Sequence, residues 1–242
     1  MAPPATREED GIPTTERVQE IFSELAPDYD RFNSLSSLGR DRWWRQRAVQ
    51  LAELDETSVV LDLAAGTAEL TLALARLGRP ARILTTDFNP DILEVGKAKV
   101  AEYQGSTRIE FEVVDAQDLP FDGTSFDVVT IAFGVRNLTD RMANFREVYR
   151  VLKPGGRYVI LEFSRPPFPP FRALYHFYLR HVLASIGGLL TGGRGSFGYL
   201  RASILAFPAQ PALAGELSRA GFRQVAWHNL TFGIVAVHVA TK

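Results

Sequence analysis

The stretch that decides the fold is Val59-Val60-Leu61-Asp62-Leu63-Ala64-Ala65-Gly66-Thr67. Its first five residues form a short apolar run with one acidic member, a pattern typical of a buried strand. The small residues that follow allow a tight turn and a close approach of the backbone to a ligand. A helix is expected from Glu69 to Leu77, and its N-terminus favours an anionic group.

The pattern of apolar strands and helices continues beyond this stretch. Asn89-Pro90 is a helix start, with Asn as the N-cap and Pro at the first helical position. Lys153-Pro154-Gly155-Gly156 is expected to end another helix before the next strand begins. Such alternation favours a parallel sheet covered on both faces. The expected strands are 82–86, 109–114, 126–132 and 157–163, and the expected helices are 90–103 and 141–152.

The C-terminal part departs from this alternation. Two strand-like runs, 222–230 and 232–241, follow a helix expected from Gln210 to Ala220. Their connection is too short for a parallel crossover, so the pair must be antiparallel. We predict an α/β fold with a Rossmann-like, seven-stranded, mostly parallel sheet and an antiparallel C-terminal strand.

The 242 residues are expected to form a single domain over residues 14–242. Residues 1–13 are expected to be a disordered leader, because they lack an apolar core. Two helices, 14–25 and 41–54, predict an N-terminal helical cap over residues 14–55.

Composition excludes several classes of protein. The net charge of −1 gives no bulk attraction to nucleic acid, so no nucleic-acid partner is expected. The absence of cysteine excludes disulfides and thiolate metal sites, and it fits a cytoplasmic location. No run of about 18 apolar residues is present, so no segment is expected to span a bilayer.

Candidate ligand contacts follow the ends of three strands, where parallel sheets bind their ligands. Gly66 and Thr67 suit the methionine carboxylate of S-adenosylmethionine, and Asp87 can accept hydrogen bonds from both ribose hydroxyls. Asp115 can accept from the adenine amine while the backbone of Ala116 meets the ring. NAD is the competing ligand, but the GxGxxG pattern fails, and Asp115 and the antiparallel terminal pair favour the methyl donor.

The chain resembles the ubiquinone/menaquinone biosynthesis C-methyltransferases from about Val18 to Lys242. The segments common to methyltransferases in general are 61–67, 115–116, 119–121 and 151–156. The segments specific to the family are Tyr29-Asp30-Arg31-Phe32-Asn33, Phe133-Gly134-Val135-Arg136-Asn137 and Leu161-Glu162-Phe163-Ser164-Arg165-Pro166, with shorter matches within 199–208 and 233–238.

The resemblance implies a class I methyltransferase that binds S-adenosylmethionine without a metal. It places Thr67, Asp87, Asp115 and Ala116 at the cofactor. The chain departs from the family at two places near the cofactor. Gly66-Thr67-Ala68-Glu69 stands where the family usually has Gly-Thr-Gly-Asp, and Ala132 stands where it often has Ser, so a hydroxyl contact is lost.

The implied reaction is methylation of a ring carbon of a prenylated quinol, with demethylmenaquinol as the expected acceptor and the benzoquinol of the ubiquinone pathway as the alternative. The ring carbon becomes nucleophilic when an adjacent hydroxyl loses its proton. Arg136 and Asn137 follow the fourth strand and are the candidate catalytic residues, together with Tyr29 on the N-terminal loop. Arginine is a poor base, so Arg136 is expected to stabilise a phenolate, and the identity of the base stays open. The alternative for Arg136 is a solvated salt bridge.

Residues 165–207 are expected to form a substrate- and membrane-facing insertion. No acidic residue occurs between Phe163 and Gly215, whereas five arginines do. Phe171, Tyr175 and Tyr178 share one helical face, which predicts an amphipathic element at a membrane surface. The alternatives are a helix packed on the sheet and a homodimer interface.

Three other functions compete with quinol methylation. They are a methyltransferase of another small or lipid substrate such as a phospholipid amine, a non-enzymatic module on the same fold, and an NAD-dependent oxidoreductase. Binding of S-adenosylmethionine would exclude the last two.

Overall fold

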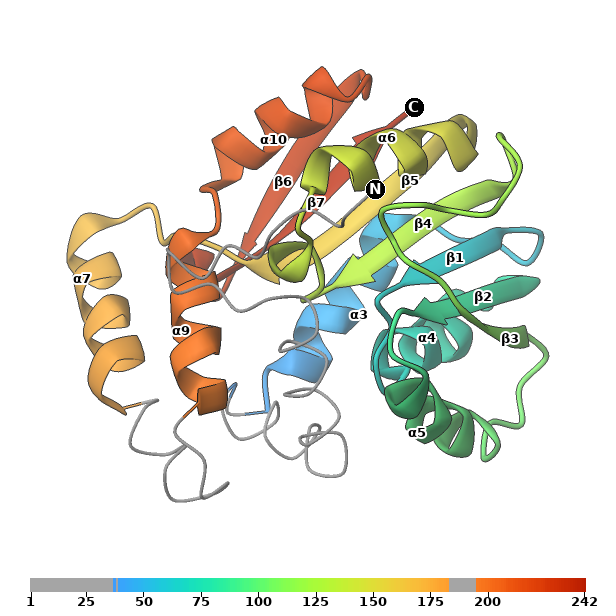
Figure 1. Cartoon of the computed structure of the whole chain (residues 1–242), viewed down its shortest axis with the longest axis horizontal. Helices are drawn as coiled ribbons and strands as arrows, with labels where there is room; N and C mark the ends of the chain where they lie inside the picture. Colours follow the sequence, from blue (N-terminus) through green and yellow to red (C-terminus); the bar gives the residue numbers. More distant parts are fainter. Residues whose placement is uncertain (1–36, 38, 183–194) are drawn as a thin grey trace, which may run out of the picture.

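The computed structural model describes residues 37, 39–182 and 195–242 (Figure 1). Seven strands form one sheet in the order β3-β2-β1-β4-β5-β7-β6. Strand β7 alone is reversed, since it pairs antiparallel with both of its neighbours in the described part of the chain. The predicted seven-stranded sheet is confirmed. The strands are β1 (Val59–Leu63), β2 (Arg82–Asp87), β3 (Arg108–Val113), β4 (Phe126–Ala132), β5 (Leu152–Phe163), β6 (Gln224–Leu230) and β7 (Val235–Thr241).

Helices cover both faces of the sheet (Figure 1). On one face, α3 (Asp41–Ala52) and α4 (Glu69–Ala73) pack Trp44 and Leu70 against β-strand residues such as Val60. On the other face, Phe145 and Leu213 belong to α6 (Arg141–Val151) and α10 (Gln210–Arg219) and join a core that includes the strand residues Leu61 and Ile131. The sheet is therefore apolar on both sides, as its near-continuous apolar strands predicted.

Two helices begin at the side-chain caps that their sequences provide. Asn89 accepts hydrogen bonds from the backbone N–H groups of Asp91 (2.9 Å) and Ile92 (3.3 Å), and Pro90 is the first residue of α5 (Pro90–Val100). Asp140 accepts from the N–H of Ala143 at 3.0 Å at the start of α6. The helix expected over 69–77 is divided, because α4 passes into a π-helical turn, η1 (Leu74–Gly78).

The expected start of β5 at Arg157 is wrong, because the strand begins at Leu152. Leu152 pairs with Phe126, and the pairing resumes with Arg157 opposite Val128, so the residues between them form a bulge. Gly155 has a φ of +78°, which glycine adopts without strain, and its N–H donates to the carbonyl of Lys242 at 3.1 Å. The helix stop signal at Lys153–Gly156 therefore lies inside the strand.

A third layer lies beyond the end of β5. It consists of α7 (Pro169–Phe177), the π-helical turn η3 (Tyr178–Val182) and α9 (Gly195–Ala206), with α7 and α9 side by side at the left of Figure 1. Tyr175 and Ile204 are buried between them. Of the three aromatic residues expected on one helical face, Tyr175 packs inward, and Phe171 and Tyr178 are half-buried.

The predicted N-terminal cap is described only in part. Helix α3 belongs to it, and the indole N–H of Trp44 donates to the hydroxyl of Thr231 at 2.8 Å. The predicted leader 1–13, the predicted helix 14–25 and Tyr29 lie outside the described residues.

Candidate functional site

Most of the candidate ligand contacts lie at one edge of the sheet, where the parallel strands end. Register places Leu63 of β1 beside Ile131 of β4, and Asp62 of β1 beside Thr85 of β2. Consequently Gly66 and Thr67, which follow β1, share this edge with Asp87 at the end of β2 and Ala132 at the end of β4. This is the edge at which such sheets bind ligands.

Asp87 is locked to the turn that follows β1. Its Oδ2 accepts a hydrogen bond from the N–H of Gly66 at 2.8 Å, and its Oδ1 accepts from the N–H of Asn89 at 3.0 Å. Removal from water raises the pKa of the Asp87 carboxyl, and these two backbone N–H groups oppose the rise. The carboxylate is thus held in one orientation at the strand end, as a group that recognises a diol requires.

The turn itself has a left-handed backbone at three positions, the first of which is Ala64 with a φ of +46°. Gly66 has a φ of +57°, and Ala68, which caps α4, has a φ of +62°. A left-handed conformation costs an alanine roughly 1 kcal/mol relative to glycine. The departure from the family pattern at Ala68 therefore adds backbone strain to this turn.

The segment after β3 is fixed by a buried chain of hydrogen bonds. The amide of Asn144 donates to the carbonyl of Ala116 at 2.6 Å and accepts from the hydroxyl of Tyr158 at 2.8 Å. Asn144 and Tyr158 are fully buried. Asp115, one residue earlier, accepts from the N–H of Gln117 at 2.9 Å. The backbone of Ala116 is therefore held rigidly, which suits recognition of a purine edge.

Phe88 is a candidate site residue that the sequence did not single out. It follows Asp87 directly and is 45% exposed. A carboxylate, an exposed aromatic ring and the fixed backbone after β3 match the ribose and adenine of an adenosyl group. The residues at this edge thus fit S-adenosylmethionine. The available signal was an aromatic residue immediately after a strand-end carboxylate.

Asp62 lies directly beneath the turn and is fully buried. Its two oxygens accept hydrogen bonds from the hydroxyls of Thr71 and Thr130, both at 2.6 Å. Burial raises the pKa of this carboxyl to about 6, although the two hydroxyls and the charge of Arg45 oppose the rise. Asp62 therefore ties β1 to α4 and β4 at the base of the site.

Arg136 lies in the short helical turn η2 (Val135–Asn137) after β4 and forms a buried ion pair with Glu162 of β5. Nη1 of Arg136 is 2.9 Å from Oε1 of Glu162, and the two side chains are only 5% and 1% exposed. Nη1 also donates to the carbonyl of Phe133, and the guanidinium lies 5.4 Å from the ring centre of Phe163. The alternative of a solvated salt bridge is wrong, since the pair is shielded from water. Burial raises the pKa of Glu162, and the positive charge of Arg136 opposes this.

Asn137 connects this turn to the third layer. Its Oδ1 accepts a hydrogen bond from the hydroxyl of Tyr199 in α9 at 2.9 Å. Neither Glu162 nor Tyr199 was predicted from the sequence to have a role, although both lie in segments that match the family. Arg136 and Asn137 come together with these partners, whereas Tyr29 lies outside the described residues.

The fold and the strand-end carboxylates define a class I methyltransferase. The structure is similar to that of a putative methyltransferase from Haloferax volcanii solved with the Trm112 activator, with a TM-score of 0.67 and 18% identity over 91% of this chain and 96% of that chain. At this identity the likeness concerns the fold alone.

The chain belongs to the ubiE/COQ5 methyltransferase family, whose model matches residues 12–242. It is 43% identical to the ubiquinone/menaquinone biosynthesis C-methyltransferase UbiE of Geobacter sp. strain M21, over 94% of this chain and 97% of that protein. It is 45% identical to the demethylmenaquinone methyltransferase of Thermus thermophilus, over 92% of this chain and 100% of that protein. The resemblance inferred from the sequence is confirmed.

Two further features concern membranes and metals. Within residues 37, 39–182 and 195–242, no helix combines the length and the apolar character needed to cross a bilayer. In the same part of the chain, no three His, Asp or Glu side chains gather as a metal site.

Proposed function

We propose that this protein transfers a methyl group from S-adenosylmethionine to a ring carbon of demethylmenaquinol, with the benzoquinol of the ubiquinone pathway as the alternative acceptor. The observation that carries the proposal is the Arg136–Asn137 turn, which follows β4 at the same sheet edge as Gly66 and Asp87. The relatives at 43% and 45% identity, a UbiE C-methyltransferase and a demethylmenaquinone methyltransferase, support the same acceptor class.

The residues at the strand ends would hold the methyl donor. Gly66 and Thr67 would receive its carboxylate at the start of α4, Asp87 its ribose, and Asp115 with Ala116 its adenine. Ala132 would line the space near the methionine portion without the hydroxyl that serine offers. Bound S-adenosylmethionine supplies an electrophilic methyl group on a positively charged sulfur.

The polar residues after β4 would orient the acceptor ring. The Asn137 amide, fixed by Tyr199, would hold a ring oxygen. Arg136, fixed by Glu162 and the Phe133 carbonyl, would keep a positive charge near the phenolate that forms when the ring loses a proton. Tyr29 is proposed to approach this site from the N-terminal segment.

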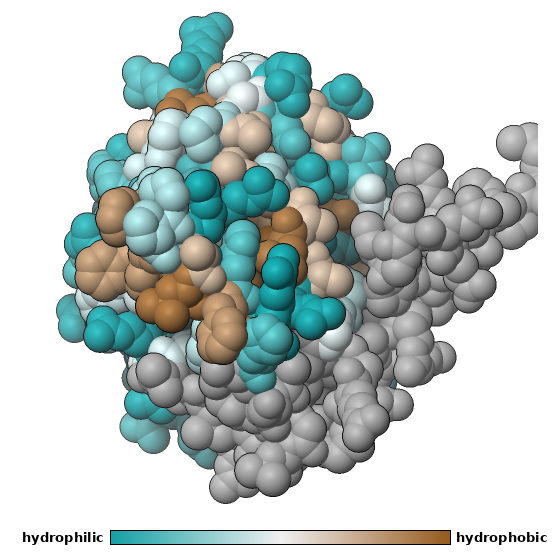
Figure 2. Space-filling model, turned by 90° about the vertical axis from the view of Figure 1, so that its left-hand side faces the viewer, coloured by the Kyte–Doolittle hydropathy of each residue, from teal (hydrophilic) through white to brown (hydrophobic). Residues whose placement is uncertain are grey.

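A prenylated quinol resides in a bilayer, and α7 offers an apolar surface with which to reach it. Phe168, Leu174 and Phe177 are 64%, 62% and 56% exposed. Figure 2 shows apolar residues gathered among hydrophilic ones on the face of the molecule that carries α7. Exposed Arg165 and Arg180 flank them, which favours anionic lipid headgroups. We propose a cytoplasmic protein that binds the membrane peripherally.

Two experiments test these proposals. Incubation with labelled S-adenosylmethionine and both quinol precursors is expected to label demethylmenaquinol, and failure with both precursors would overturn the substrate assignment. Co-sedimentation with anionic vesicles at low salt is expected for the wild type and reduced in Phe177→Ser. Light scattering of the lipid-free protein shows whether this face instead joins two copies in a homodimer.

A further inference from the structure

The third layer contains a buried hydroxyl without a hydrogen-bond partner among the described residues. Tyr175 is 6% exposed, and its hydroxyl contacts neither a donor nor an acceptor there. Its ring packs with Leu179 and Ile204, which accounts for the aromatic ring but not for the oxygen. A buried polar group left unpaired destabilises the folded state, so its presence requires an explanation.

Tyr175 lies close to the charged pair behind the Arg136–Asn137 turn. Burial raises the pKa of Tyr175 well above its usual range, and the neighbouring Tyr178 raises it further. The charge of Arg136 lowers this pKa, and the charge of Glu162 raises it. Tyr199 experiences the same two charges, and its pKa is also raised by burial. Two neutral phenols, one from α7 and one from α9, therefore stand near the residues proposed to orient the acceptor.

A quinol ring carries two oxygens on opposite sides, and a rigid alignment requires a partner for each. The Tyr199 hydroxyl already donates a hydrogen bond to Asn137, so these two residues together provide a partner for one ring oxygen. Tyr175 provides a second hydroxyl near the turn, and no described residue accepts a hydrogen bond from it.

We propose that Tyr175 is an acceptor-binding residue that donates a hydrogen bond to a ring oxygen of the quinol. The proposal rests on the proposed function. The donated bond strengthens as negative charge develops on that oxygen, because hydrogen bonds to charged acceptors are stronger than neutral ones. The hydroxyl is thus unsatisfied in the free enzyme and satisfied in the complex.

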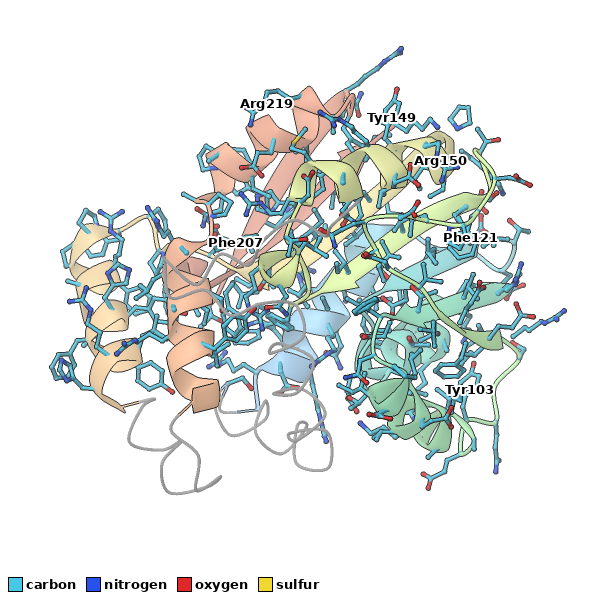
Figure 3. The ribbon with its side chains drawn as sticks, viewed as in Figure 1. Tyr103, Phe121, Tyr149, Arg150, Phe207 and Arg219 are labelled. Carbon is cyan, nitrogen blue, oxygen red and sulfur yellow. The ribbon has the colours of Figure 1, made fainter. Side chains whose placement is uncertain are left out.

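The test is Tyr175→Phe, with Tyr103→Phe as the matched control. The Tyr103 hydroxyl donates to the carbonyl of Ala75 at 3.1 Å, and this residue lies on the side of the molecule opposite α7 (Figure 3). Tyr175→Phe is expected to keep or raise the melting temperature, keep the affinity for S-adenosylmethionine, and lower kcat/KM for demethylmenaquinol about tenfold. Tyr103→Phe is expected to lower the melting temperature and leave kcat/KM unchanged.

Two results would overturn the role of Tyr175. One is an unchanged kcat/KM in Tyr175→Phe measured beside an active wild type. The other is a loss of melting temperature as large as that of Tyr103→Phe, which would show a structural partner for the hydroxyl. An inactive wild type with both quinols counts instead against the proposed function, so the two failures are distinguishable.

Discussion

Asp62 should make the stability of the protein depend on pH in a direction opposite to that of most carboxylates. It is fully buried, and its oxygens accept from Thr71 and Thr130 at 2.6 Å. Substitution with asparagine keeps the shape and removes the titration, since an amide can accept from one hydroxyl and donate to the other. Asp62→Asn therefore isolates the contribution of ionisation.

The magnitude follows from the pKa of Asp62, which rises from the ordinary 3.8 to about 6 on folding. At 1.36 kcal/mol per unit, the difference corresponds to about 3 kcal/mol of linkage free energy. Because the folded pKa is the higher one, this stabilisation is complete below the unfolded pKa and disappears as the pH rises through the folded pKa. Roughly 2 kcal/mol of it should be lost between about pH 4 and about pH 7.

The assay is urea unfolding of the wild type and Asp62→Asn at several pH values across this window. The free energy of unfolding of the wild type, minus that of the variant, should fall by about 2 kcal/mol as the pH rises. Subtraction cancels the other titrating groups. A difference that stays flat would show that folding leaves the pKa of Asp62 unchanged, and one that grows with pH would show that folding stabilises the charged form. Either result would refute the reasoning.

Three further changes test the site. Glu162→Ala leaves Arg136 as a buried charge without its partner and should reduce the free energy of unfolding by about 3–5 kcal/mol, measured by urea unfolding, with Glu162→Gln as the milder control. Gly134→Ala should destabilise by about 1–3 kcal/mol, because a Cβ there would lie 2.8 Å from that of Ala64; an unchanged melting temperature would contradict this. Phe88→Ala should weaken S-adenosylmethionine binding, measured by calorimetry, about tenfold. It should not lower stability, since the ring is exposed. Equal affinities of the wild type and the variant would show that Phe88 does not contact the cofactor.

The sequence predicts those parts of the fold that local signals determine. Asn89-Pro90 begins a helix as expected, because a cap acts on the next turn of the chain. The bulge in β5 was missed, because it depends on pairing with β4 and on a hydrogen bond from Gly155 to Lys242. Such pairings are not visible in the local pattern.

The same distinction separates the parts of the site. Asp87 was found because every strand end of a parallel sheet reaches the same edge, so its position alone gave it a role. Glu162 and Tyr199 contact Arg136 and Asn137 from 26 and 62 residues away. The contacts of these two side chains become apparent only when β5 and α9 are placed beside η2. The inward direction of Tyr175 likewise depends on α9, which the helical periodicity of α7 cannot reveal.

The left-handed Ala68 also links two positions that are far apart in the chain. A Cβ placed on Gly96 of α5 would lie only 3.2 Å from the Cβ of Ala68 and 3.2 Å from the carbonyl oxygen of Gly66. The methyl group of Ala68 thus fills space that a side chain at position 96 would need. A glycine at 68 would remove one of these two contacts, whereas the backbone carbonyl of Gly66 would still restrict a side chain at 96.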